Sequence, residues 1–252
     1  MIDKPDEYQI MYQVETSLWW YKILHAKALR TIERHFSSKQ VRILDVGCGT
    51  GGMLSFLRAN GYTSLSGVDL SPDAVRLTES RGFAVQTLDL HQIATFDPQA
   101  RFDVIICNDV LCYFDNAQIA HILSEFRKRL NSNGLVISNN NAFDAFTGVH
   151  SIVLNIPRRF VIEEFKKIFE ELEMQMATHT YWSFFLSPLI WVYRKIQLLA
   201  LRLGVIKLQN VGSDVGYPGD FQNNLFLNIV KFEEKCFKTA PFGSSLFWVV
   251  KV

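Results

Sequence analysis

The sequence predicts an α/β fold in which helices cover both faces of a doubly wound, parallel sheet. Apolar runs that suit buried strands recur at 41–46, 65–70, 83–88, 102–107 and 134–139. Amphipathic helical spacing fills the intervals between them, and a glycine-rich turn follows the first run directly. Strands that alternate with helices form parallel sheets. The length and the high apolar content predict one large core, so we expect one domain over residues 1–252.

The glycine-rich turn belongs to the segment VRILDVGCGTGG at 41–52. Gly47, Gly49 and Gly51 have no Cβ that would hold a ligand away from the turn backbone. Residues 53–59 are predicted to be helical, and a helix that starts directly after such a turn points its free N–H groups at a ligand above the loop. The turn therefore predicts a nucleotide-cofactor pocket.

Two classes of cofactor fit this turn, because Gly47, Gly49 and Gly52 also match the G-x-G-x-x-G spacing of dinucleotide-binding folds. The carboxylate of Asp45 would repel a diphosphate, whereas it suits the cationic amino end of S-adenosylmethionine. Asp69 ends the second apolar run, where a carboxylate can accept both ribose hydroxyls of either cofactor. Asp45 therefore favours the methyl donor, and Asp69 does not discriminate.

Two segments, ILDVGCGTG at 43–51 and GVDLSPDAV at 67–75, together resemble the first two motifs of the class I S-adenosylmethionine-dependent methyltransferases. The resemblance implies a Rossmann-like sheet of seven strands, mostly parallel, with an antiparallel edge formed by the last two strands. It also implies cofactor contacts, namely the methionine end with Asp45, Gly47, Gly49 and Gly51, the ribose with Asp69, and the adenine with Leu70.

Two further segments extend the resemblance. VQTLDL at 85–90 resembles the third motif, which implies that Asp89 receives the adenine amino group and that Leu90 is its backbone neighbour. FDVIICNDVLCYF at 102–114 resembles the fourth strand and its loop, which places Asn108, Asp109 and Val110 near the sulfonium and methionine. For Asp89 and Asp109 an ordinary role as a helix cap or turn residue stays open, since Asp after a strand commonly begins the next helix.

The remaining elements follow the same rhythm. Apolar spacing predicts a helix over 118–130 that ends before Asn133 and Gly134, and the strand GLVISNNN comes next. A second amphipathic helix over 160–172 leads to an extended segment at 174–181, and SLFWVVKV closes the chain at 245–252. Ser71 and Pro72 mark a helix start.

The N-terminal residues 1–38 form a predicted helical segment, in which the pattern from Glu15 to His25 includes Trp19, Trp20 and Tyr21. Adjacent helical residues point about 100° apart, so the three rings cannot all face one core. We interpret them as a lid over the cofactor cleft, with Trp20 as a candidate substrate contact. Packing of the rings against the sheet edge is the alternative interpretation.

Residues 181–220 are predicted to be a late apolar insertion. Positions 174–213 contain no acidic side chain, and the run YWSFFLSPLIWVY at 181–193 is too short to span a bilayer. On a helix over 189–205, Arg194, Lys195 and Arg202 would share about a quarter of the circumference. This profile predicts either a cap over the substrate or peripheral membrane contact through 181–207, and a cap that touches lipid could admit a lipid-linked acceptor.

No general base is evident. Many relatives have a His in the loop after the fourth strand, where this chain has Tyr113. The catalytic candidates are therefore His150, in the loop after the fifth strand, and Tyr113 as a hydrogen-bonding positioner.

Arg158 and Arg159 are candidate substrate contacts. The pair could hold a phosphate or carboxylate, or it could form ion pairs with Glu163 or Glu164. Together with PFGSSL at 241–246, the Arg-Arg-Phe run resembles a subgroup of the family in which many members modify sugars, polyketides or lipid intermediates.

The composition excludes other classes. A net charge of +1 provides no broad basic surface, so we expect no nucleic-acid partner. The four cysteines form no C-x-x-C pair, and we expect them to be reduced and to hold no metal. The N-terminus has charges where a secretory signal needs an apolar stretch, which predicts a cytoplasmic protein, with membrane association left open.

The sequence therefore predicts a methyltransferase that moves the methyl group of S-adenosylmethionine to a small-molecule, sugar or lipid-linked acceptor, at oxygen. A catalytically silent protein that binds the cofactor and acts as a partner subunit is the alternative, and a nicotinamide-dependent dehydrogenase ranks below it. Neither the acceptor nor the oligomeric state is predicted.

Overall fold

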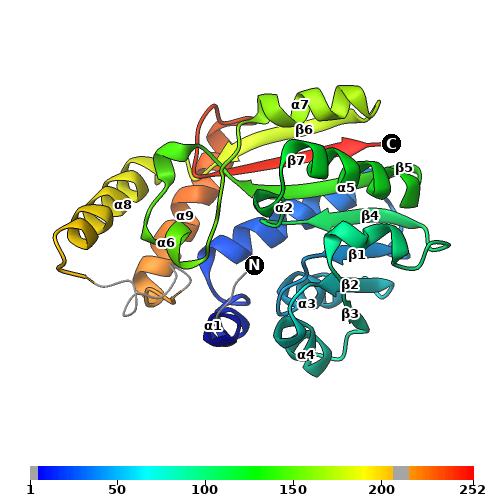
Figure 1. The fold of residues 1–252 in the computed structure, drawn as a ribbon, viewed down its shortest axis with the longest axis horizontal. Helices are drawn as coiled ribbons and strands as arrows, with labels where there is room; N and C mark the ends of the chain where they lie inside the picture. The colour runs from blue at the N-terminus through cyan, green and yellow to red at the C-terminus, as the bar shows by residue number, and fades with distance from the viewer. Residues whose placement is uncertain (1–4, 207–215) are drawn as a thin grey trace.

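The computed structural model describes residues 5–206 and 216–252, which form a sheet of seven strands with helices on both faces (Figure 1). The strands are β1 (Ile43–Val46), β2 (Leu65–Asp69), β3 (Val85–Thr87), β4 (Phe102–Cys107), β5 (Leu130–Asn141), β6 (Gln175–Trp182) and β7 (Ser245–Lys251). They lie in the order β3-β2-β1-β4-β5-β7-β6, and β7 is antiparallel to both of its neighbours. The predicted Rossmann-like sheet is confirmed, with β6 as the outermost strand beyond β7.

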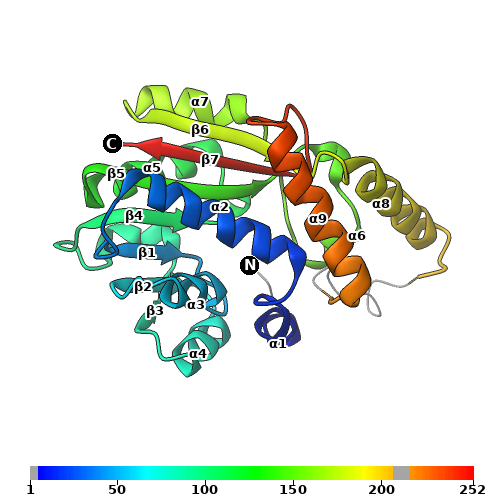
Figure 2. The same ribbon diagram turned by 180° about the vertical axis from the view of Figure 1, so that it is seen from behind.

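Helices and short 3₁₀ turns connect the strands. They are α1 (Pro5–Val14), α2 (Trp19–His35), α3 (Gly52–Ala59), α4 (Pro72–Ser80), η1 (Leu90–Thr95), η2 (Leu111–Tyr113), α5 (Asn116–Arg129), η3 (Asp144–Phe146), α6 (Val149–Val153), α7 (Ile162–Glu171), α8 (Ser187–Arg202) and α9 (Asp220–Cys236). Helices α2, α3 and α9 cover one face of the sheet, and α5 and α7 cover the other (Figure 2). Their buried apolar side chains form the core on each face. The core thus has two layers separated by the sheet.

Local signals explain most helix starts. Ser71 accepts a hydrogen bond from the Ala74 amide and Pro72 is the first residue of α4, as expected. Asp115 and Gln118 form a capping box, so α5 begins two residues before the predicted start. The helix ends at Arg129, before Asn133 and Gly134 as predicted, but β5 begins at Leu130, earlier than the expected strand start at Gly134. Asn133 and Gly134 belong to a bulge between the pairs Phe102–Leu130 and Val104–Leu135, where Asn133 has a φ of 65°.

The N-terminal segment differs from the single helix expected from Glu15 onward. α1 ends at Val14, a turn follows, and α2 starts at Trp19, so Glu15 lies between two helices. Both views place α1 beside α3 and α4, at the carboxyl ends of β1 and β2 (Figures 1 and 2). This break allows α1 to lie across the edge of the sheet where the glycine-rich turn is found.

The insertion between β6 and β7 contains α8 and α9. Tyr181 and Trp182 belong to the buried end of β6, so the apolar run is partly core. α9 packs along α2, whereas α8 projects beyond the sheet and contacts η3 and α6 (Figure 1). Residues 207–215, which include the end of the predicted 181–207 contact, lie outside the described residues. In the described part of the chain, no helix combines the length and apolar character needed to cross a bilayer.

Two faces of α8 differ sharply. The face toward the protein has half-buried Ile190, Arg194, Gln197, Leu198 and Leu201. The opposite face is apolar and exposed, with Leu189, Val192, Tyr193, Ile196, Leu199 and the following Leu203 between 46% and 69% accessible. The three cations that share about a quarter of the circumference differ in exposure: Lys195 and Arg202 are exposed, whereas Arg194 is half-buried and donates a hydrogen bond to the Phe146 carbonyl.

Candidate active site

The glycine-rich turn connects β1 to α3 at the carboxyl edge of the sheet. Gly47, Gly49 and Gly51 have φ values of 71°, 54° and 84°, which favour glycine. A Cβ on Gly47 would lie 2.2 Å from Val110 Cγ2, and one on Gly51 would lie 2.8 Å from Thr78 Cγ2. The turn therefore requires glycine for its own conformation and for contacts with neighbouring segments, before any ligand is considered.

Asp69 fixes this turn from the end of β2. Its two carboxylate oxygens accept hydrogen bonds from the Gly49 and Ser71 amides, both at 2.9 Å. Burial raises the pKa of Asp69, and these backbone hydrogen bonds oppose the rise. Each oxygen keeps a further lone pair, which suits the two hydroxyls of a ribose. Leu70 follows with 43% of its surface accessible, in position to lie against a ligand.

Asp45 lies in β1 beneath the turn and is 3% accessible. Burial, followed by the negative charges of Asp69 and Glu15, raises the pKa of Asp45 to about 8. Among the described residues no hydrogen bond supports its carboxylate, so the charged form is costly until a cation arrives. This cluster of acids selects a positively charged ligand.

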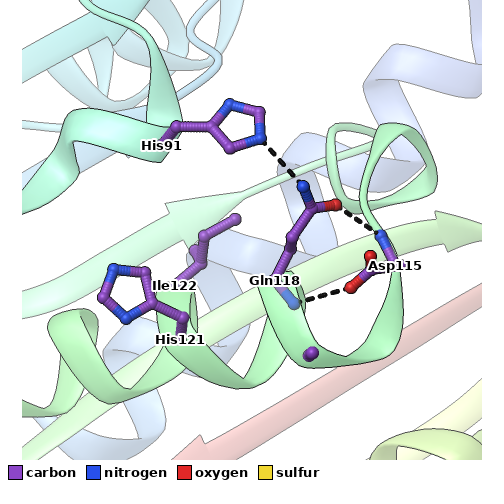
Figure 3. A pocket seen from close by; sticks show the side chains of 6 residues that line it. His91, Asp115, Gln118, His121 and Ile122 are labelled. Atoms are coloured by element: carbon purple, nitrogen blue, oxygen red, sulfur yellow. Dashed lines mark hydrogen bonds between the residues drawn. The ribbon is translucent and has the colours of Figure 1, made fainter.

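The Asp89 side chain caps the start of η1, the 3₁₀ turn that follows it. One oxygen accepts hydrogen bonds from the His91 amide at 2.9 Å and from the His91 ring at 2.8 Å, which lowers the pKa of Asp89. Figure 3 shows His91 reaching Gln118 of α5 across a hollow of about 310 Å³ that His121 also lines. Asp89 is thus a cap of η1, and its second oxygen is the one left for an adenine amino group. The Leu90 side chain is buried in the core.

Asp109 follows β4 in a left-handed conformation, with a φ of 57°. Its carboxylate accepts hydrogen bonds from the amides of Asn139 at 3.0 Å and Asn141 at 3.4 Å, both in β5. Burial raises the pKa of Asp109 to about 7, although the Asn139 hydrogen bond and Arg159 lower it. The neighbouring Asn108 accepts from the Asn139 amide of the main chain. Asp109 is therefore a half-buried carboxyl whose pKa is raised to about 7, and it is not a cap, since Val110 holds the N-cap position of η2.

Asn139 connects Asp109 to the insertion. The Trp182 indole donates to Asn139 Oδ1 at 2.8 Å, and the ring of Trp20 lies 5.6 Å from that of Trp182. Trp20 thus packs in the core on the face of α2, as in the alternative interpretation. Burial, followed by the charges of Glu15 and Asp109, raises the pKa of Tyr21, whose ring contacts Trp20 and His25.

The two arginines have separate roles. Arg158 forms an ion pair with Glu164 and lies 4.6 Å from the Phe160 ring centre, so the pairing alternative describes it. Arg159 is 6% accessible and donates to Ser151 Oγ at 3.0 Å and to the Ala142 carbonyl at 3.3 Å. Burial lowers the pKa of Arg159 to about 10, while Asp109 opposes the change. Arg159 therefore lies near the reactive edge, and Arg158 is held at the start of α7.

The two predicted catalytic residues, Tyr113 and His150, lie in η2 and α6, in the connections that follow β4 and β5. Tyr113, in η2, donates its hydroxyl proton to the Leu154 carbonyl at 3.1 Å, and burial raises its pKa. That hydroxyl holds the α6 segment in place. His150 is half-buried in α6.

Comparison with known proteins decides the family. A model of the methyltransferase domain matches residues 20–197, which is more than half of the chain. The chain belongs to this methyltransferase family. The resemblance to class I S-adenosylmethionine-dependent methyltransferases is thereby confirmed, and S-adenosylmethionine is the cofactor of the family.

Relatives support the assignment at low identity. The chain is 30% identical over 114 residues to a ubiquinone biosynthesis O-methyltransferase of Coxiella burnetii, which covers 40% of this chain and 47% of that protein. It spans about half the length of the curated relatives it matches.

Solved structures share the fold. A methyltransferase from Archaeoglobus fulgidus matches with a TM-score of 0.57 and 16% identity, over 92% of this chain and 94% of that chain. Magnesium protoporphyrin IX methyltransferase from Synechocystis PCC 6803, solved with bound S-adenosylmethionine, matches with a TM-score of 0.50 and 16% identity. That match covers 63% of this chain and 71% of that one.

The donor set of this methyltransferase fits its cofactor. Asp45 offers a buried carboxyl to a ligand with ammonium and sulfonium charges, and Asp69 offers free lone pairs to vicinal hydroxyls. No group of three or more metal-ligating side chains occurs among the described residues, and the four cysteines are free.

Two residues that shape the site, Glu15 and Asn139, were not predicted from the sequence. Glu15 contacts the glycine-rich turn from 37 residues upstream, and no motif spacing connects them. Asn139 organises the other side of the site. Its signal was present in the sequence, since three consecutive Asn residues at the end of a buried strand must find hydrogen-bond partners.

Proposed function

We propose that this methyltransferase transfers the methyl group of S-adenosylmethionine to an oxygen of a small-molecule or lipid-linked acceptor, sugars included. The observation that carries the proposal is the position of Asp109, a half-buried carboxyl next to Val110, which packs on Gly47 of the turn. A cation-selecting cluster and a proton acceptor thus flank the same loop. The Coxiella relative is an O-methyltransferase by name, which supports an oxygen acceptor.

Asp109 is the proton acceptor in this proposal. When bound, the cofactor supplies an electrophilic methyl group, and a hydroxyl acceptor must lose its proton during an in-line displacement. The pKa of Asp109, about 7, is matched to operation near neutral pH. Asn139 and Asn141 orient its carboxylate and leave lone pairs for the acceptor hydroxyl. Arg159 lies close enough to stabilise an anionic acceptor group.

A methyl-transfer assay tests this proposal. Labelled S-adenosylmethionine is incubated with catechol, an alkylated catechol and a nucleotide sugar, and products are separated by chromatography. We expect a methyl ether, and Asp109→Asn should lower kcat by roughly 100-fold or more while S-adenosylhomocysteine still binds. His150→Asn serves as the comparison, because an equal loss there with Asp109→Asn active would assign the base to His150.

The silent-partner alternative makes a different prediction. A silent protein would bind S-adenosylhomocysteine in titration calorimetry, yet label no compound in a cell lysate. That result would overturn the proposed transfer and keep the cofactor assignment.

We also propose that the insertion contacts a membrane peripherally through residues 181–207. The outward face of α8 is apolar, and Lys195 and Arg202 are exposed on the same helix. Positions 174–213 contain no acidic residue that would repel anionic lipid. A docked cap with an apolar outer face combines both predictions, since it covers the site and lies on a lipid surface.

Vesicle flotation tests the contact. The protein should float with vesicles of phosphatidylcholine and phosphatidylserine, and Ile196→Glu with Leu199→Glu should abolish flotation. Phe232→Glu removes an equally exposed apolar side chain from α9 and is the matched control. If wild-type protein stays at the bottom with neutral and anionic vesicles alike, the membrane proposal is wrong.

A further inference from the structure

α1 covers the glycine-rich turn. Met11 Sδ is 3.3 Å from the position of a Cβ on Gly49, and Tyr8 makes a hydrogen bond to Ser71 beside Asp69. Burial, followed by the charge of Asp69, raises the pKa of Tyr8 to about 12. The lid expected from the aromatic residues of α2 is thus provided by the preceding helix.

Arg81 attaches this helix to the end of α4. Its guanidinium donates to the Tyr12 carbonyl at 3.0 Å and lies 4.0 Å from the Tyr12 ring centre. The same guanidinium forms an ion pair with Glu15 at 2.5 Å, and both side chains are mostly buried. Arg81 therefore links α4, α1 and the residue that follows α1.

Glu15 fills the N-terminus of α3. Its carboxylate accepts hydrogen bonds from the Gly52 amide at 3.0 Å and from the Thr50 hydroxyl at 2.5 Å. Gly51, at the N-cap position, has no side chain that could accept them. A Cβ on Gly52 would lie 2.3 Å from Glu15 Oε2, so the fit is tight. Burial raises the pKa of Glu15, and its three hydrogen-bond donors oppose that rise.

The amides of the turn are also used internally. Gly47 and Cys48 donate to the Val68 carbonyl, Gly49 donates to Asp69, and Gly51 donates to the Cys48 carbonyl. In dinucleotide-binding folds, the N–H groups at this place bind a diphosphate. Here the N–H of Gly52, the first residue of α3, is bonded to a carboxylate of the same chain.

We propose that Glu15 is a specificity-determining residue, an internal anion that occupies the position of a diphosphate and restricts the site to an adenosyl ligand without phosphates. Arg81 balances its charge. A diphosphate at the Gly52 amide would have to displace the Glu15 side chain and move α1 away from the turn. A ligand that contacts Asp45 and Asp69 leaves Glu15 in place. The inference rests on the proposed function only through its cofactor, and the acceptor plays no part in it.

Removal of the carboxylate tests this inference by gain of binding. Glu15→Ala exposes the Gly52 amide, the Thr50 hydroxyl and Arg81, which together form an anion site. We expect inorganic diphosphate to bind this variant at least about tenfold more tightly than wild type, and to raise its Tm in a thermal scan. Glu15→Gln is the matched control, because its side chain still occupies the space at the Gly52 amide. This variant should not gain diphosphate binding.

Gly52→Ala provides a second route if Glu15→Ala does not fold. The added Cβ displaces the Glu15 side chain without removing it, and Gly52 does not have a positive φ that would strain alanine. Amide hydrogen exchange in α1 should accelerate by roughly tenfold or more in this variant, because its attachment to the turn is lost. S-adenosylhomocysteine should still bind.

Two outcomes would overturn the inference. Either folded Glu15→Ala fails to bind diphosphate more tightly than wild type, or Gly52→Ala leaves exchange in α1 unchanged. Absence of methyl transfer would not affect these measurements. Failure of wild type to bind S-adenosylhomocysteine would instead remove the cofactor assignment.

Discussion

The two sides of the site are stabilised in different ways. On the cofactor side, Asp69 and Glu15 bind backbone amides of the turn, so the main chain itself is the scaffold. On the acceptor side, Asn139 connects Asp109 to Trp182, and these contacts join side chains from β5, β6 and the loop after β4. The comparison teaches that substitutions should act differently on the two sides. Loss of Asp69, which holds the turn backbone, should mainly change ligand affinity, whereas loss of Asn139, which links buried side chains, should mainly change stability.

Asn139→Ala should produce the largest effect. The substitution leaves the Trp182 indole and the Asp109 carboxylate without their partner in a fully buried position. We expect the free energy of unfolding to fall by about 3 kcal/mol, measured by urea denaturation. Asn141→Ala, which removes only a 3.4 Å hydrogen bond, is the control and should cost less than about 1 kcal/mol. Equal losses of unfolding free energy in the two variants would mean that the contacts of Asn139 with Asp109 and Trp182 do not stabilise the fold more than the contact of Asn141 does.

Asp69→Ala should produce the next largest effect, this time on affinity. Loss of the carboxylate removes the ribose contact and frees the Gly49 and Ser71 amides. We expect S-adenosylhomocysteine to bind about 2 kcal/mol more weakly in titration calorimetry. Asp89→Ala, whose carboxylate is already held by His91, should weaken binding less. The ribose assignment fails if Asp69→Ala binds the ligand as wild type does.

Asp45→Asn should separate affinity from stability. The folded pKa of Asp45, about 8, is above that of the unfolded chain. Its contribution to stability is therefore complete at low pH and is lost as pH rises through about 8. The variant should then be more stable than wild type at pH 8, by roughly 2 kcal/mol, yet should bind S-adenosylhomocysteine more weakly. Thermal unfolding at pH 6 and pH 8 and calorimetry measure the two changes.

Proton release sharpens the same prediction. The ammonium group of S-adenosylhomocysteine favours the ionised carboxyl of Asp45, so wild type should release protons when it binds this ligand at pH 7. Calorimetry in buffers with different ionisation enthalpies measures the number released. Asp45→Asn should release fewer, and an unchanged number would assign the proton to another group.

Arg158→Ala should produce the smallest effect. Its ion pair with Glu164 is partly exposed, and such pairs contribute less than about 1 kcal/mol. Arg159→Ala removes two buried hydrogen bonds and should destabilise the fold more. Urea denaturation of both variants compares them. A larger loss for Arg158→Ala would contradict the separation of the two roles.

The cofactor side could be predicted from sequence because its determinants are local. Gly47, Gly49 and Gly51 have the positive φ values that make their positions readable as a motif, and Asp69 follows at a fixed distance. The sheet could be predicted for the same reason, since buried strands are continuous apolar runs.

The rest could not be predicted because it depends on contacts between distant segments. The expected lid was assigned to Trp20, yet the helical pattern does not reveal the break after Val14 that frees α1. The orientation of Arg194 depends on the Phe146 carbonyl and on the space above Gly148, where a Cβ would lie 2.9 Å from Arg194 Cγ. Helical spacing alone places a side chain on a face and does not show what that face meets.

The position of β7 has a consequence for how this chain matures on the ribosome. β7 comprises the last residues of the sheet, Ser245–Lys251, and it lies between β5 and β6. Until that segment leaves the exit tunnel, β5 has an open edge and β6 has no neighbour in the sheet. Nascent chains of this protein therefore carry an unpaired hydrogen-bonding edge from the emergence of β5, which ends at Asn141, until β7 emerges. During that interval they should depend on chaperones more than proteins whose neighbouring strands follow one another closely in the chain.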